Sequence, residues 1–356
     1  MDELADAIIK EITIRQHELE DEVKSIYFGG GTPSLLKTAH FEKLFNVIYK
    51  NFNVSASAEI TLEANPDDLT ETKLIELRNT PFNRLSIGIQ SFNDEDLQLM
   101  NRTHNSTQAE AAIRDSVRHG FENISADFIY GLPGMSLNSW NKNLDKMFSL
   151  PVKHLSCYCL TVEPGTQLHK QVLNNRVRVP GDDLNAIFFE TLMDRASQES
   201  FEHYEISSFS LPGYHSRHNS AYWNGSSYSG FGPSAHSYDG ARRWFNIASN
   251  AAYIQSLKQN TLPVTEEHLT DIDKYNEYIM VSLRTSAGAD IEQVERNWPG
   301  EIFESFRNEI KPYLKNGYMN SANNKIKLTN KGKLLADRIA SSLFYSVKNH
   351  KKNKAV

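Results

Sequence analysis

The sequence predicts an α/β fold built around a parallel β-sheet that curls toward a barrel or an open half-barrel. Three observations lead to this prediction. Apolar, β-prone segments alternate with helical segments five times in succession, each ends in glycine or polar residues, and three glycines at 29–31 follow the first of them. Apolar strands that alternate with helices indicate a parallel sheet buried on both faces. Right-handed crossovers then curl such a sheet.

The expected elements follow one another along the chain. An amphipathic helix at 2–19 comes first, with Leu4, Ile8, Ile12 and Ile14 among acidic and basic residues. Strands are expected at 25–28, 59–63, 84–89, 124–129 and 154–160, and helices near 38–51, 70–79, 94–101, 107–119, 136–149 and 183–199. A sixth strand near 202–208 ends the series.

Changes in composition divide the chain into three predicted parts. Residues 1–208 form the partial barrel. Residues 209–265 are rich in aromatic residues, Gly, Ser and His, which indicates a loop-rich extension over the barrel mouth. Residues 266–356 form a small C-terminal domain of helices and a short strand pair, similar to a winged helix. Its basic end, 348–354, is expected to be solvated and frayed.

Composition excludes several classes of protein. The chain has 356 residues, of which 39% are hydrophobic, and a net charge of -6, so it shows no electrostatic footprint for nucleic acid. No apolar run approaches the roughly 18 residues that span a bilayer, and the acidic first twenty residues exclude a signal peptide. Cys157 and Cys159 are the two cysteines, and their spacing on one expected strand bridges poorly. A reduced, cytoplasmic protein is the simplest interpretation.

The polar residues at the strand ends form a candidate binding site, because the carboxyl ends of parallel strands open on one face. A glycine platform with Glu63 suits an amino-acid end, Gln90 and Asp127 suit hydroxyls, and Arg102 suits a carboxylate. The alternative is a structural mouth, because a carboxylate at a strand end usually caps the next helix. Several polar ends around one platform favour the binding site.

Four motifs carry a resemblance to a known family. They are GGGTPS, EITLEANP, SIGIQSFND with NR eleven residues after its Gln, and DFIYGLPG, in that order over about 25–240. The chain thereby resembles the radical SAM family related to oxygen-independent coproporphyrinogen III oxidase. The resemblance implies a partial (β/α)6 barrel that binds S-adenosylmethionine (SAM) beside a [4Fe–4S] cluster. By that resemblance the SAM-binding residues are Gly30, Gly31, Thr32, Glu63, Gln90, Arg102, Asp127 and Thr161.

A further motif points to a branch of this family. His218-Asn219-Ser220-Ala221-Tyr222-Trp223 is similar to the HNxxYW motif of the HemW branch, the heme chaperones. The resemblance implies that His218, Tyr222 and Trp223 bind heme, and His236 is a second candidate. From the residues alone, a loop histidine that caps its own aromatic cluster is the competing interpretation.

The chain also departs from the family pattern, because the family's CxxxCxxC motif is absent. Cluster iron needs thiolates, so we expect no site-specific [4Fe–4S] cluster and no reductive SAM cleavage in this chain. Either Met1 is an internal methionine of a longer protein, or the lineage has lost the cluster. The first explanation is favoured, because the missing piece is a strand plus its loop, which would leave 25–28 as an unpaired sheet edge.

Three functions remain open at this point. The first is a HemW-like chaperone that carries heme to acceptor proteins. The second is an oxidoreductase that decarboxylates coproporphyrinogen III. The third is a cluster-free relic that binds SAM or a partner without chemistry. In none of them is nucleic acid or a membrane-spanning segment expected.

Overall fold

The protein's structure, a computed structural model, describes residues 1–346. The basic end at 348–354 therefore lies outside the described residues. The described chain separates into two compact bodies, and each is taken by itself. The first, called the sheet body here, comprises 20–203 and 207–218; the second comprises 1–19, 204–206 and the chain from 219 onward.

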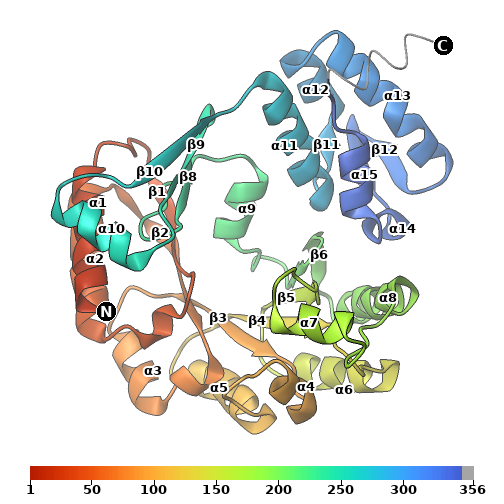
Figure 1. Cartoon of the computed structure of the whole chain (residues 1–356). Helices are drawn as coiled ribbons and strands as arrows, with labels where there is room; N and C mark the ends of the chain where they lie inside the picture. The colour runs from red at the N-terminus through yellow and green to blue at the C-terminus, as the bar shows by residue number, and fades with distance from the viewer. Residues whose placement is uncertain (347–356) are drawn as a thin grey trace. The chain divides into compact units, whose positions relative to one another are not determined.

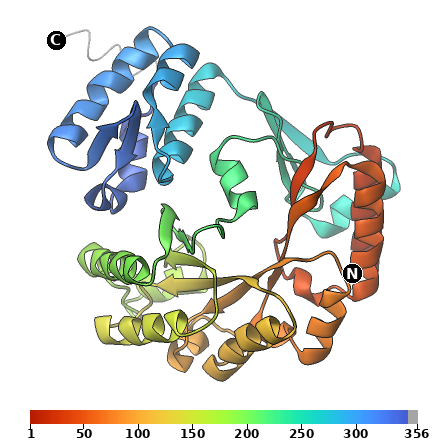
Figure 2. The same ribbon diagram turned by 180° about the vertical axis from the view of Figure 1, so that it is seen from behind.

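The sheet body contains the predicted parallel sheet. Its strands are β1 (Val23–Phe28), β2 (Val54–Ala64), β3 (Arg84–Gln90), β4 (Asn123–Tyr130) and β5 (His154–Cys159). Each pairs in parallel with the next, and β1 stands at one end of the strand order. The sheet curls as expected of a half-barrel, with its helices on the outer side (Figures 1 and 2).

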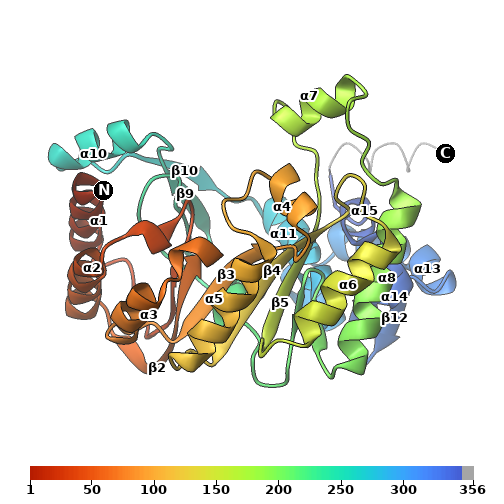
Figure 3. The same ribbon diagram turned by 90° about the horizontal axis from the view of Figure 1, so that it is seen from below.

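Helices connect the strands, and most of them cover the outer face of the sheet, whereas the helix at Gln167–Leu173 projects away from it (Figure 3). They are α2 (Thr38–Asn51), α3 (Glu71–Arg78), α4 (Asp94–Leu99), α5 (Ser106–Arg118), α6 (Leu137–Phe148), α7 (Gln167–Leu173) and α8 (Asp182–Gln198). Side-chain caps fix several of their starts: Asn105 accepts from the Gln108 N–H, and Ser136 from the Ser139 N–H.

The strand expected near 202–208 forms only over 202–205, and a second, reversed strand takes its expected place beside the fifth. The chain forms β6 (Glu202–Glu205), turns, and returns as β7 (Ser208–Ser210). β7, not β6, lies beside β5 and pairs with it antiparallel, His154 opposite Ser210. Only two residues separate β6 from β7, and a connection that short reverses the chain, whereas a parallel pair needs a long crossover.

The second body begins with helix α1 (Asp2–Ile14), which is shorter than the expected 2–19. Its buried residues are Ala5, Ala7, Glu11 and Ile12, whereas Ile14 is 39% exposed. α1 packs on α10 (Asn250–Lys258), where Ala7, Tyr253 and Leu257 form a small core. The expected apolar face is therefore only partly right.

The segment 209–265, expected to be loop-rich, contains more regular structure than its composition indicated. It forms α9 (Arg217–Trp223), β8 (His236–Tyr238), β9 (Arg242–Asn246), α10 and β10 (Val264–His268). The three strands pair antiparallel in the order β10-β9-β8. Its boundaries as a domain stay a prediction.

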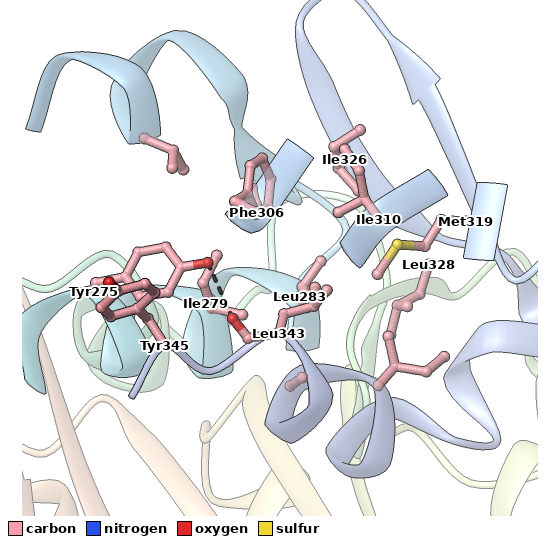
Figure 4. Close-up of a cluster of buried hydrophobic side chains, with 14 of the residues drawn as sticks. Tyr275, Ile279, Leu283, Phe306, Ile310, Met319, Ile326, Leu328, Leu343 and Tyr345 are labelled. Carbon is pink, nitrogen blue, oxygen red and sulfur yellow. Dashed lines mark hydrogen bonds between the residues drawn. The ribbon is translucent and has the colours of Figure 1, made fainter. Parts of the chain in front are cut away.

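The C-terminal part has its own hydrophobic core, as Figure 4 shows around Tyr275, Phe306 and Ile326. The helices are α11 (Asp271–Arg284), α12 (Ile291–Asn297), α13 (Glu301–Lys315), α14 (Asn330–Lys333) and α15 (Ala336–Ser342). The strands β11 (Ala289–Asp290), β12 (Met319–Ala322) and β13 (Lys325–Leu328) form a small antiparallel sheet. This is the winged-helix-like arrangement that the sequence predicted.

Candidate functional site

The inner face of the half-barrel is polar, and this property creates the candidate site. Neighbours in a parallel sheet share a face, and the register pairs Tyr27 with Thr61, Glu63 with Ser86 and Asp127 with Ser156. The alternate residues on the same strands are apolar and pack toward the helices. Toward the carboxyl edge, the polar side chains become partly exposed.

Glu63 ties the glycine loop to the sheet. Its Oε1 accepts a 2.6 Å hydrogen bond from the Tyr27 hydroxyl, and its Oε2 accepts a 3.2 Å bond from the Gly30 N–H. Gly30 and Gly31 have φ values of 73° and 81°, a conformation that favours glycine. Apart from the glycine itself and its two chain neighbours, no atom of the described residues lies within 4 Å of the position that a Cβ would take on either glycine. The loop thus offers open backbone next to a carboxylate.

Gln90 and Arg102 lie together at the end of β3. Gln90 has a φ of 63°, where the pairing of β3 with β4 is irregular. A Cβ on Gly88 would lie 2.8 Å from Gln90 Nε2 and 3.2 Å from Arg102 Nη2, so the glycine makes room for both. Arg102 Nη2 donates to Asn65 Oδ1 at 2.6 Å, which brings it beside the end of β2.

Asp127, on β4, is the second carboxylate of the candidate site. Ser86 Oγ donates to its Oδ2 at 3.1 Å, and Ser125 Oγ to its Oδ1 at 3.3 Å. Loss of water around the carboxylate raises the pKa of Asp127 to about 6, while the Ser156 and Ser86 hydrogen bonds and the Arg84 charge oppose the rise. Glu63 raises it further, so the two carboxylates are electrostatic neighbours.

Thr32 and Thr161 are the two predicted residues that have not yet been placed at this edge. Thr32 precedes the short 3-10 turn Pro33–Leu35 and accepts the Leu35 N–H through its carbonyl. Thr161 follows β5 and is exposed. The structure therefore brings Gly30, Glu63, Gln90, Arg102 and Asp127 to one edge by contacts, whereas Thr161 shares that edge through strand order alone.

His218 lies on the same inner face, at the amino-terminal side of the glycine loop. Its ring stacks on the Tyr27 ring with centroids 4.6 Å apart and an interplanar angle of 17°. Its Nδ1 is 3.1 Å from Ser25 Oγ. Burial lowers the pKa of His218 to about 4, so the imidazole is neutral at pH 7. Tyr27 therefore touches His218 with its ring and Glu63 with its hydroxyl.

The other three residues of the predicted heme set belong to the second body. The Tyr222 ring packs against the Tyr228 ring at 4.5 Å, and Arg284 lies over the Trp223 ring at 5.6 Å. His236 faces Phe245 with ring centroids 5.3 Å apart, beside a groove that includes Pro263. His218 thus lies in the same body as the residues predicted to bind SAM, whereas Tyr222, Trp223 and His236 lie in the other.

Comparisons with known proteins show the family and the fold of this chain. The model of the radical SAM superfamily matches residues 3–147, and that of the HemN C-terminal domain matches 269–335. Heme chaperone HemW of Bacillus subtilis is 32% identical over 322 residues, covering 90% of this chain and 85% of that protein. This chain belongs to the HemW family of radical SAM proteins. HemW of Lactococcus lactis is 30% identical over 95% of this chain and 88% of its own length.

A solved structure supports the fold of this HemW-family chain. Coproporphyrinogen III oxidase (HemN) from Escherichia coli superimposes with a TM-score of 0.82 at 24% identity, covering 96% of this chain and 83% of that one. At that identity the likeness shows the fold alone. The half-barrel and the C-terminal domain of this chain therefore have the same fold as the corresponding parts of that enzyme. The likeness by itself does not assign that enzyme's activity to this chain.

The described residues fit the two cofactors of the superfamily differently. The glycine loop with its open backbone and the carboxylates Glu63 and Asp127 fit a ligand that carries an ammonium group and hydroxyls, as SAM does. A cluster fits poorly, because Cys157 and Cys159 are both free and burial raises the pKa of each thiol, opposite to what iron ligation needs. Within 1–346, no group of three or more His, Cys, Asp and Glu could hold a metal ion. That this chain lacks the cluster stays a prediction.

Several site residues were missed by the sequence analysis. Gly88, Ser86 and Ser125 shape the surroundings of Gln90 and Asp127, and Tyr27 and Glu59 contact His218. The signal that would have found most of them is the alternation of polar and apolar residues along each strand, which marks two different faces.

Proposed function

We propose that this chain binds heme and delivers it to acceptor proteins. The observation that carries the proposal is the 32% identity to the Bacillus subtilis heme chaperone over 85% of that protein's length. The HNxxYW motif at 218–223 supports it. Its His218 is neutral at pH 7, and a neutral imidazole is the form of histidine that ligates iron. His218 is the proposed ligand, Tyr222 and Trp223 supply flat apolar surface, and His236 is a second candidate.

We further propose that the carboxyl edge of the sheet binds SAM. Glu63 and the Gly30–Gly31 backbone would hold the amino-acid end, Gln90 and Asp127 the hydroxyls, and Arg102 a carboxylate. Thr32 and Thr161 complete the proposed set. The proposed function does not use a [4Fe–4S] cluster, because the described residues include no set of thiolates that could hold one.

The likeness to the Escherichia coli oxidase does not favour decarboxylation of coproporphyrinogen III, because it extends to the fold only. The proposed partners of the chain are heme and the proteins that accept heme from it. Of the described helices, none has the length and the apolar composition that crossing a bilayer requires.

A heme titration tests the ligand. Purified protein is titrated with hemin, and the Soret band gives the Kd for wild type and His218→Phe, which keeps a ring over Tyr27 but offers no iron ligand. We expect at least about a tenfold weaker Kd for the variant, equivalent to about 1.4 kcal/mol. His215→Phe, three residues away in an exposed pair with Glu202, is the matched control. Equal affinity of wild type and His218→Phe would remove His218 as the ligand.

Delivery is tested separately. Heme-loaded protein is mixed with an apo-hemoprotein, and the transfer rate is compared with that from free hemin and from heme bound to serum albumin. A chaperone transfers heme faster than an unspecific carrier. Transfer no faster than from albumin would leave a heme-binding protein without the delivery function.

A further inference from the structure

Glu59 is a buried carboxylate in the middle of β2, and it holds the chain at His218 by its backbone. Only 6% of the residue is exposed. Its Oε1 accepts the His218 N–H at 3.0 Å, and its Oε2 accepts the Arg217 N–H at 3.0 Å. Ser216 Oγ donates to Oε1 at 3.4 Å. One side chain thus receives three donors from three successive residues at the start of α9, 157 to 159 positions away in sequence.

The strand β1 supports the side chain of the same histidine. Ser25, paired in register with Glu59, has its Oγ 3.1 Å from His218 Nδ1. Tyr27, two residues along the same face, stacks under the ring. The backbone and the ring of His218 are therefore fixed by three neighbouring residues of the inner face, and Glu59 provides the backbone part.

A carboxylate suits this position for a physical reason. The first N–H groups of a helix have no partner within the helix, and a carboxylate there accepts hydrogen bonds from them. Its negative charge is also attracted to the positive end of the helix dipole. Burying a carboxylate is costly unless it is fully hydrogen-bonded. A glutamine of the same size has one acceptor oxygen and would turn its NH2 group toward a backbone N–H, so it cannot replace both bonds.

We propose that Glu59 is a positioning residue for heme binding, acting through the backbone of His218. This inference rests on the proposed function, in which His218 ligates heme iron. Glu59 itself does not touch the iron in this proposal. It fixes where the imidazole stands on the inner face, so heme affinity should depend on Glu59 only as long as His218 is present.

A double-mutant cycle tests the inference. Hemin Kd values are measured for wild type, Glu59→Gln, His218→Phe and the double variant, with circular dichroism and thermal melting as checks of folding. We expect Glu59→Gln to weaken binding at least about tenfold in wild type and less than about twofold in the His218→Phe background, because coupled residues are non-additive. Glu42→Gln, the same change on the exposed side of α2, should leave the Kd unchanged.

A spectroscopic readout separates positioning from general damage. The iron–histidine stretching band of the ferrous heme complex, seen by resonance Raman, should shift or disappear in Glu59→Gln and stay in Glu42→Gln. If Glu59→Gln does not fold, Glu59→Asp carries the same test, since it keeps both oxygens and withdraws them by one methylene.

The outcomes are distinguishable. If His218→Phe weakens binding but Glu59→Gln binds as wild type, or if Glu59→Gln loses the same factor in both backgrounds, the positioning role is overturned and the proposed function stands. If wild type fails to bind hemin, the proposed function fails; if His218→Phe binds as wild type, only the assignment of His218 as the ligand fails. The positioning role fails in either case.

Discussion

At the scale of single residues, Asp127 shows how the polar inner face controls charge. Its pKa of about 6 lies above the roughly 3.9 of an exposed aspartate. The folded protein therefore holds the proton up to about pH 6, whereas the unfolded chain releases it near pH 4. The stability that Asp127 contributes is present below pH 4 and is lost as the pH rises through 6.

Asp127→Asn tests this linkage, because asparagine imitates the protonated form at every pH. We expect the difference in free energy of unfolding, variant minus wild type, to increase by about 1–3 kcal/mol between pH 4 and 7.5. Urea denaturation across that range measures it. Asp194→Asn, on the exposed side of α8, is the control for the chemical change. A difference independent of pH would show that Asp127 has the same pKa in the folded and the unfolded chain.

At the scale of secondary-structure elements, α1 is anchored by a buried charge pair. Glu11 and Arg15 are 0% and 2% exposed, and Arg15 Nη1 lies 2.7 Å from Glu11 Oε1. Glu11 also accepts from the Gly232 N–H, from Asn246 and from the Tyr253 hydroxyl. These partners join α1 to β9, to α10 and to the turn before β8.

Removal of Glu11 should be costly, because it takes one of two acidic partners from the buried Arg15, leaving Glu18, and removes the acceptor for the Gly232 N–H and the Tyr253 hydroxyl. We expect Glu11→Ala to reduce the free energy of unfolding of this part by about 3–5 kcal/mol. Glu3→Ala, on the same helix in an exposed pair with Lys258, should leave the urea midpoint unchanged. Chemical denaturation of both variants measures the contrast. Equal midpoints for Glu11→Ala and wild type would mean that Arg15 finds water when its partner is lost.

The same elements show what the sequence could predict. The five parallel strands and the strand-end residues Glu63, Gln90 and Asp127 were predictable, because apolar runs and polar ends are local signals. A finer signal was available in EITLE and NISAD, where every second residue is polar. Read with a period of two, it predicts a sheet with one polar and one apolar face.

Other features were beyond any local signal. The direction of β7 depends on a turn of two residues, and the apolar pattern of β6 and β7 is the same for either direction. Glu59 and His218 are 159 positions apart, and Glu11 and Tyr253 are 242 apart. Each of these carboxylates has its partner far away in the sequence, and only the folded chain shows that partner.

At the scale of the whole molecule, the sheet body and the C-terminal part each have a packed core of their own. Phe128 on β4 is fully buried between the sheet and its helices, whereas Phe306 on α13 is fully buried among Tyr275, Ile279 and Ile326 of the C-terminal part. Chains with several cores often unfold in parts. A cavity in one core should therefore destabilise mainly the elements that pack around that core.

Hydrogen exchange followed by mass spectrometry tests this independence with two matched variants. Phe306→Ala should lower the local free energy of opening by about 3–5 kcal/mol and deprotect the amides of α11 to α15, while those of β2 to β4 keep their protection. Phe128→Ala should give the reverse pattern, since the same ring is removed from the other core. Faster exchange throughout the described chain in either variant would instead show a single cooperative unit, in which a local cavity destabilises the carboxyl edge of the sheet, His218 and the C-terminal helices together.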